Sequence, residues 1–168
     1  LTWVYASEPL IPRGPDGSFD KDMIFPASQI VTHRDRHWIY YNGFRERHGT
    51  ADRGPHGIGL ATLKRDRFIS LSAKGTQLGS ILTKPFQLAG SRLQVNAHGE
   101  HIRVEVLDEN AKKIPGHTAQ SGKNGALRWE PAWANGRDLA AVKDKPVRLR
   151  FQLRNAKLFA FQFINPPP

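Results

Sequence analysis

Apolar and polar residues alternate along most of the chain with the period of two that is typical of β-strands. The clearest example is residues 147–154, in which every second side chain is apolar (Val147, Leu149, Phe151 and Leu153). This pattern predicts a half-buried antiparallel strand. Residues 158–163 repeat the period with Phe159, Phe161 and Phe163 on one face. Residues 154–157 between the two segments predict a hairpin turn.

Similar segments occur in the rest of the chain. Residues 102–106 predict a strand, and residues 93–95 predict another that lies across a turn containing Gly99. In the N-terminal third, residues 29–33 and 38–44 predict one hairpin, and residues 58–63 and 68–71 predict a second. A 3.6-residue period is not sustained anywhere, and only residues 138–143 fit a helical turn. We therefore predict an all-β fold.

Composition changes along the chain and predicts two parts. Residues 1–63 are rich in aromatic residues, His and Gly, and they form the first β segment. Residues 64–168 carry the regular alternating strands. Their length suits an antiparallel, jelly-roll-like β-sandwich of about 100 residues.

The charge balance favours anionic partners. The chain has 168 residues, with 25 Lys and Arg against 15 Asp and Glu, for a formal net charge of +10. The anionic partners that this balance favours include nucleic acid, phosphoesters and acidic polysaccharide. Together with the motifs described below, the partner that we expect is a glycan or an anionic small molecule. The chain contains no Cys, which excludes disulfides and thiolate chemistry. Its apolar runs are too short to predict a membrane span.

Several motifs resemble a known arrangement. Residues 9–20 (PLIPRGPDGSFD), residues 38–43 (WIYYNG) and the pair His48-Gly49 are similar to the last blade of five-bladed β-propeller glycosidase-like proteins. Residues 59–71 resemble the exit from that propeller, and residues 145–151 and 155–161 resemble the closing strands of a C-terminal sandwich. The resemblance implies that residues 1–63 are propeller-blade-like, and that the parent protein is secreted or periplasmic.

One blade cannot supply a glycosidase site, because propeller glycosidases collect their catalytic carboxylates from several blades. The resemblance therefore implies a carbohydrate-binding or accessory module and not a complete glycosidase. A single blade would also leave apolar patches without neighbours, which predicts a homo-oligomer, in particular a two-fold dimer. The residues expected in these patches are Trp3, Tyr5, Ile24, Phe25, Trp38 and Tyr40.

A metal-dependent hydrolase of phosphate or other esters is the alternative function. His33 and His37 flank the turn Arg34-Asp35-Arg36, and imidazoles facing each other across a hairpin could share a divalent metal such as Zn or Ca. Solvated turn histidines are the other interpretation of this pair. The additional ligands expected from the next loop are His48, Asp52 and His56, with Asp52 also a candidate base.

A second candidate cluster is His98-Gly99-Glu100-His101, which we expect on a hairpin turn. The turn could bring both imidazoles to a metal, with Glu100 as a ligand or general base. A polar hairpin tip without chemistry is the interpretation that we favour here.

Trp129 and Trp133 are the candidate sugar platform. At a spacing of four on a strand they share a face, and flat aromatic rings stack on pyranose rings. Arg128 and Arg137 would then bond hydroxyl groups. The alternative is that one or both tryptophans belong to the core.

Arginines recur on the outward faces of the predicted strands and could form a stripe for phosphate or sulfate groups. Nucleic acid is a disfavoured ligand, because no known nucleic-acid module is present. An ordinary solvated face is the simpler interpretation of the same pattern. The arginines concerned are Arg103, Arg128, Arg148, Arg150 and Arg154.

Overall fold

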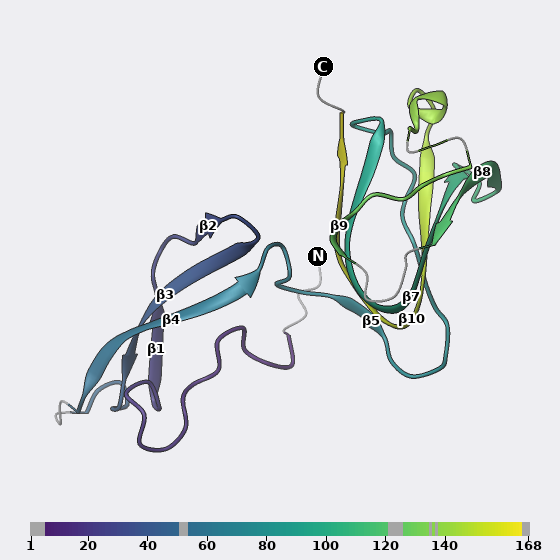
Figure 1. Ribbon diagram of the computed structural model, residues 1–168. Helices are drawn as coiled ribbons and strands as arrows, with labels where there is room; N and C mark the ends of the chain where they lie inside the picture. The colour runs from purple at the N-terminus through teal and green to yellow at the C-terminus, as the bar shows by residue number, and fades with distance from the viewer. Residues whose placement is uncertain (1–5, 51–53, 121–125, 135, 137, 166–168) are drawn as a thin grey trace. The chain divides into compact units, whose positions relative to one another are not determined.

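The chain forms two compact units, Leu1–Phe68 and Ile69–Pro168, which we call the N-terminal and C-terminal units (Figure 1). The computed structural model describes residues 6–50, 54–120, 126–134, 136 and 138–165. The units divide after Phe68, whereas composition placed the boundary after Leu63.

The predicted all-β class is confirmed, and the strand pairs are antiparallel. In the described residues the remaining regular element is one 3-10 turn, η1 (Ala140–Val142), inside the segment expected to make a helical turn. No helix there has the length and apolar character that crossing a membrane requires. The N-terminal unit contains β1 (Met23–Pro26), β2 (Val31–His33), β3 (Arg36–Phe44) and β4 (His56–Lys64). The C-terminal unit contains β5 (Leu71–Ala73), β6 (Gly79–Leu82), β7 (Arg92–Asp108), β8 (Lys113–Gln120), β9 (Ala126–Trp129) and β10 (Val147–Ile164).

The N-terminal sheet is built around β3. β4 pairs with one edge of β3, while β1 and β2 share the other edge. The loop preceding the sheet covers one of its faces, where the ring of Phe19 lies over Gly43 and Gly57. A Cβ at Gly43 would approach this ring to 2.7 Å, so only glycine admits it. Tyr41 extends the cover and donates a hydrogen bond of 2.8 Å to the carboxylate of Asp20.

The first predicted hairpin exists with a shorter loop, and the second is wrong. β2 and β3 are joined by Arg34 and Asp35 alone, with Arg34 in the left-handed region at φ 52°. After β4 ends, residues 71–73 form β5, which pairs with β10 in the C-terminal unit and not with β4. Phe68 packs its ring on His37, with 4.9 Å between ring centroids.

The C-terminal unit is one sheet folded over on itself. β7 and β10 pair from Val147↔Asp108 to Ile164↔Arg92, and both strands bend where Gly99 faces Ala156. β6 and β8 flank the ribbon on one side of the bend, and β5 and β9 flank it on the other. The result is a sandwich-like pair of layers, β6-β10-β7-β8 and β5-β10-β7-β9, with the bend visible where β7 and β10 curve together (Figure 1).

Two predicted hairpin turns are therefore wrong, because they are bends inside continuous strands. Gly99 adopts φ 135° and Asn155 adopts φ 43°, conformations that let the paired strands turn sharply without separating. The bend also shifts the alternation by one residue. The buried positions are odd before it in β7 (Leu93, Val95, Ala97) and even after it (Ile102, Val104, Val106).

The core fills the space between the two layers. Side chains from both arms of each long strand are buried there. The buried Phe151 ring lies 5.4 Å, between centroids, from the ring of Phe161, which is 38% exposed at the edge of the core. The predicted inward set of residues 147–153 is confirmed. Phe159 does not share the Phe161 and Phe163 face, because the register shifts between Leu158 and Ala160. The buried residues of this core include Leu88, Leu93, Val95, Ile102, Val104, Val106, Trp133, Leu139, Val147, Leu149, Phe151, Leu153 and Leu158.

Candidate functional site

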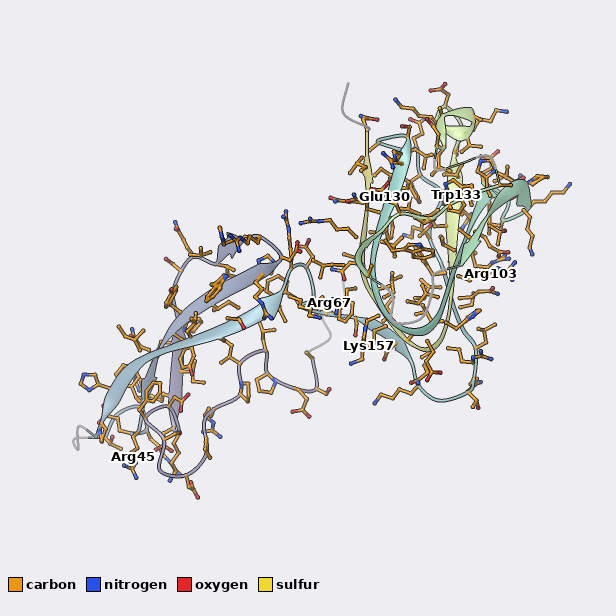
Figure 2. All side chains as sticks on the ribbon, in the orientation of Figure 1. Arg45, Arg67, Arg103, Glu130, Trp133 and Lys157 are labelled. Carbon is orange, nitrogen blue, oxygen red and sulfur yellow. The ribbon has the colours of Figure 1, made fainter. Side chains whose placement is uncertain are left out.

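The layer β6-β10-β7-β8 carries a charged cluster centred on Glu105. The Glu105 side chain is only 2% exposed. Its carboxylate lies 3.1 Å from Arg103 Nη2, 3.1 Å from Lys113 Nζ and 3.4 Å from Arg150 Nη1. We call Arg103, Glu105, Lys113 and Arg150 the Glu105 cluster; Arg103 is labelled in Figure 2.

Sheet register brings these four residues together. Arg103 and Glu105 lie two apart on β7 and so project to the same side of the sheet. Arg150 on β10 is the direct cross-strand partner of Glu105. Lys113 on β8 is the cross-strand partner of Leu107, which lies two residues after Glu105 on β7. The side opposite carries the buried residues Val104 and Val106, so the cluster faces outward from the core.

Burial and charge act in opposite directions on Glu105. Burial alone raises the pKa of its carboxyl. The hydrogen bond from Lys113 and the charges of Lys113, Arg103 and Arg150 lower it by more, so the pKa lies below the ordinary glutamate value. Glu105 is therefore ionised at neutral pH and holds three cationic groups in fixed positions.

The cluster retains positive charge and hydrogen-bond donors. Three cations and one carboxylate leave a net charge of 3 − 1 = +2. A guanidinium carries five N–H donors, so the contacts with Glu105 use only part of the capacity of Arg103 and Arg150. The Lys113 side chain is 64% exposed and Arg103 is 36% exposed, so both reach solvent. The geometry suits a sulfate, carboxylate or phosphate group.

Two further arginines lie on the same side of β10, at the alternate positions Arg148 and Arg154. The Arg148 guanidinium donates to the carbonyl oxygens of Glu109 (2.8 Å) and Thr83 (3.0 Å), which anchors it to the sheet. Arg128, the fifth arginine of the predicted stripe, lies on β9 in the other layer. We call Arg103, Lys113, Arg148, Arg150 and Arg154 the basic face.

His33 and His37 do not face each other. The short loop pairs His33 with Arg36 and Thr32 with His37, so the two imidazoles project to opposite sides of the sheet. His37 Nε2 accepts a hydrogen bond from the Asp66 backbone N–H (3.0 Å), and Nδ1 therefore donates to Thr32 Oγ1 (2.8 Å). Both nitrogens of this buried ring are used, and His37 has a structural role.

The remaining metal candidates are dispersed. His48 is exposed in the loop between β3 and β4, and His56 stacks on Phe44 at the start of β4. Asp52 lies outside the described residues. Across the part of the chain that the structure describes, no group of three His, Asp or Glu side chains is placed to hold a metal ion.

The segment 98–101 lies within β7 and not on a hairpin tip. His98 and Glu100 line a hollow of about 300 Å³ at the bend, together with Lys74 and Lys157. His101 follows on the other side of the bend, where it pairs with Arg154. The bend thus separates His101 from the hollow that His98 and Glu100 share.

The two tryptophans do not form an exposed platform. Trp133 is 5% exposed and belongs to the core, which is the second of the two interpretations left open by the sequence (Figure 2). Trp129 is half-buried and packs against the same core. Arg128 is exposed beside it on β9, and Arg137 lies outside the described residues.

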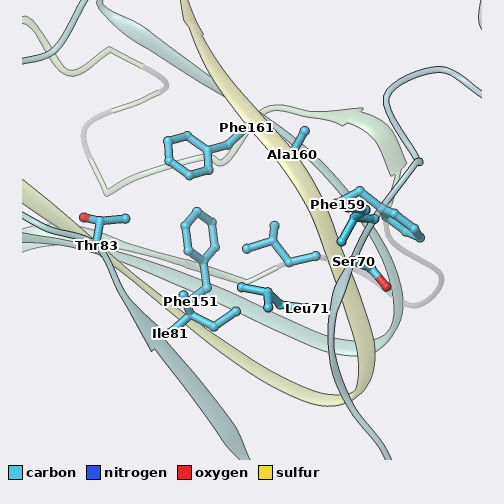
Figure 3. A pocket seen from close by; sticks show the side chains of 10 residues that line it. Ser70, Leu71, Ile81, Thr83, Phe151, Phe159, Ala160 and Phe161 are labelled. Atoms are coloured by element: carbon cyan, nitrogen blue, oxygen red, sulfur yellow. The ribbon is translucent and has the colours of Figure 1, made fainter. Parts of the chain in front are cut away.

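An apolar pocket of about 320 Å³ opens on the C-terminal unit. Figure 3 shows Phe151, Phe159 and Phe161 around it, with Leu71 and Ile81 below. The nearby polar side chains are those of Ser70 and Thr83, and the Thr83 hydroxyl already accepts a hydrogen bond from the Leu149 N–H. The pocket therefore offers few groups that could orient a sugar.

Glu105 and Lys113 are the site residues that sequence reasoning missed. The alternation in 102–106 places Glu105 on the polar side of its strand, which predicts exposure and not burial. The available signal was the local charge pattern, since Glu105 follows Arg103 in a strand expected to neighbour the arginine-rich 147–154 strand. The ion pairs of Glu105 depend on how β7, β8 and β10 are aligned, and this alignment cannot be predicted from the sequence pattern alone.

Comparison of the chain with protein-family models, curated proteins and solved structures produced no match. The resemblance to propeller glycosidase-like proteins accordingly rests on the sequence motifs, and it remains a prediction.

Proposed function

We propose that the chain is a carbohydrate-binding accessory module that takes an acidic glycan on the basic face of its C-terminal unit. The observation that carries this proposal is the Glu105 cluster, in which one buried carboxylate fixes three partly exposed cations. Fixed donors lose little entropy when an anion binds, which distinguishes them from mobile surface lysines. The formal net charge of +10 adds long-range attraction for a polyanion.

An acidic glycan fits this surface better than a neutral one. The face supplies charged donors from three neighbouring strands, β7, β8 and β10, which suits the repeated sulfate or carboxylate groups of a polymer. Among the described residues, Trp129 and Trp133 do not form an exposed pair for stacking, since Trp133 lies in the core. The sandwich-like layers provide a stiff support for the donors. The alternative of a metal-dependent hydrolase has less support, because the described residues contain no group of three side chains that could hold a metal ion.

Affinity electrophoresis with dextran sulfate, uncharged dextran and duplex DNA tests the proposal. We expect retardation by dextran sulfate, none by dextran, and weaker retardation by DNA of equal charge concentration. Equal retardation by DNA would mean that the surface recognises charge alone. Absence of retardation by dextran sulfate and by polygalacturonate at low salt would overturn the proposal.

Removing single donors locates the site. Lys113→Gln and Arg103→Gln should each weaken dextran sulfate binding roughly fivefold, because one lost charged contact costs about 1 kcal/mol. Arg47→Gln makes the same change of charge on an exposed arginine of the N-terminal unit and serves as the matched control. If Arg47→Gln weakens binding as much as Lys113→Gln, the glycan does not bind at the Glu105 cluster.

A further inference from the structure

Within the described residues of the N-terminal unit, the face of the sheet opposite Phe19 is a broad apolar surface. The residues of this surface lie at alternate positions of β3 and at the positions of β1, β2 and β4 that pair with them. Tyr40 faces Leu60, Asn42 faces both Ile58 and Phe25, and Trp38 faces Val31. Five apolar side chains on this face are strongly exposed: Phe25 at 50%, Val31 at 51%, Tyr40 at 47%, Ile58 at 78% and Leu60 at 43%. We call this surface the β3 face.

The β3 face is large enough to be an interaction surface. Taking about 200 Å² for one fully exposed side chain of this size, the five most exposed residues present on the order of 500 Å². The half-buried Trp38 and Phe44 and the exposed Asn42 and Thr62 of the same face add to this area. The total approaches the roughly 800 Å² that each partner contributes to a standard interface. Solvent-exposed patches of this extent mark interaction sites.

The distribution of charge identifies the partner. The chain has a formal net charge of +10, so two copies repel each other over most of their surface. The centre of the β3 face carries neither acidic nor basic side chains. Arg36 and Lys64 form a cross-strand pair at one end of it. A neutral centre is where two copies of a basic chain can meet without opposing like charges.

We propose that the β3 face binds the β3 face of a second copy of this chain, in a two-fold dimer with the two β3 strands antiparallel. β3 is nine residues long. At about 3.3 Å per residue, the antiparallel arrangement separates the two Arg36 and Lys64 ends by roughly 30 Å. A parallel arrangement would superimpose them. Packing of two sheet faces at about 10 Å buries both apolar surfaces, as in a sandwich core.

Sedimentation velocity from low to high micromolar concentration measures the assembly. We expect a monomer–dimer equilibrium for the unmodified chain. Ile58→Lys should raise the dimer dissociation constant at least about 100-fold, because it sets a lysine from each copy inside a desolvated apolar interface. Ile58 is 78% exposed in the single chain, so the substitution leaves its folding intact, which circular dichroism checks.

Ile69→Lys is the matched control, since Ile69 is 74% exposed and lies in the C-terminal unit. This variant should dimerise as the unmodified chain does. A chain that remains monomeric at high micromolar concentration, or an Ile58→Lys variant that dimerises normally, would overturn the proposal. Loss of the dimer in Ile69→Lys alone would place the interface on the C-terminal unit and would also overturn it.

Discussion

Replacing Gly99 with alanine is expected to destabilise the C-terminal unit by about 4 kcal/mol. Gly99 stands at φ 135°, a conformation that a residue with a side chain rarely adopts. A Cβ at this position would lie 2.4 Å from the Ala156 Cα and 2.4 Å from the Asn155 carbonyl oxygen. Both obstacles are backbone atoms of the paired strand, so a change of side-chain rotamer cannot relieve the clash.

Gly75→Ala is the control that separates the cost of an unfavourable backbone conformation from the cost of a steric clash. Gly75 also has a positive φ, at 69°, but no atom lies within 4 Å of the position that its Cβ would take. Gly75→Ala should therefore cost only about 1 kcal/mol, from the backbone conformation alone. Urea unfolding, together with amide hydrogen exchange of β7 and β10, measures both variants. A Gly99→Ala variant that is no less stable than Gly75→Ala would show that the two strands do not approach closely at the bend.

The bend explains how far the fold could be predicted. Alternation identified the strand segments on either side of Gly99 and of Asn155, and it identified the buried face of residues 147–153 correctly. The face predicted for residues 158–163 was wrong at Phe159, because the register shifts between Leu158 and Ala160. The alternation shifts by one residue at each bend, and glycine and asparagine occur there, so each bend has the local signature of a turn. Only the pairing of Gly99 with Ala156 shows that both strands continue and bend together. That pairing joins residues far apart in the sequence.

The histidine and tryptophan predictions depended on the same kind of information. A loop of two residues in place of three moves His37 opposite Thr32 and turns it away from His33. Trp133 follows β9 and enters the core, which its spacing from Trp129 could not indicate. The outward positions of the arginines could be predicted from the period of two alone. Four of the five predicted arginines lie on β7 and β10.

Replacing Glu105 with glutamine is expected to lower the free energy of unfolding by about 3 kcal/mol at pH 7, because it leaves Arg103, Lys113 and Arg150 together without a compensating charge. The estimate is at the low end for a broken buried ion pair, since the three cations are partly exposed and regain some hydration. Glu100→Gln is the control on the same strand. Its carboxylate is exposed, so it should change stability by less than about 0.5 kcal/mol.

The free energy of unfolding of the unmodified chain differs from that of Glu105→Gln, and the pH dependence of this difference shows whether the charge of Glu105 is the cause. Folding lowers the pKa of Glu105 below its ordinary value of 4.5, so the unfolded chain binds this proton more tightly than the folded chain does. The ionised carboxylate therefore stabilises the fold fully above pH 4.5, and this contribution is lost as the pH falls through the lower folded pKa. Glutamine cannot titrate, so the difference in free energy of unfolding between the unmodified chain and Glu105→Gln should be constant near neutrality and shrink in acid.

Urea unfolding of both proteins from pH 7 to pH 3 measures this difference, and the contributions of the other carboxylates cancel in it. A gap that persists unchanged at pH 3 would assign the effect to packing of the amide and not to the charge that holds the three cations in place.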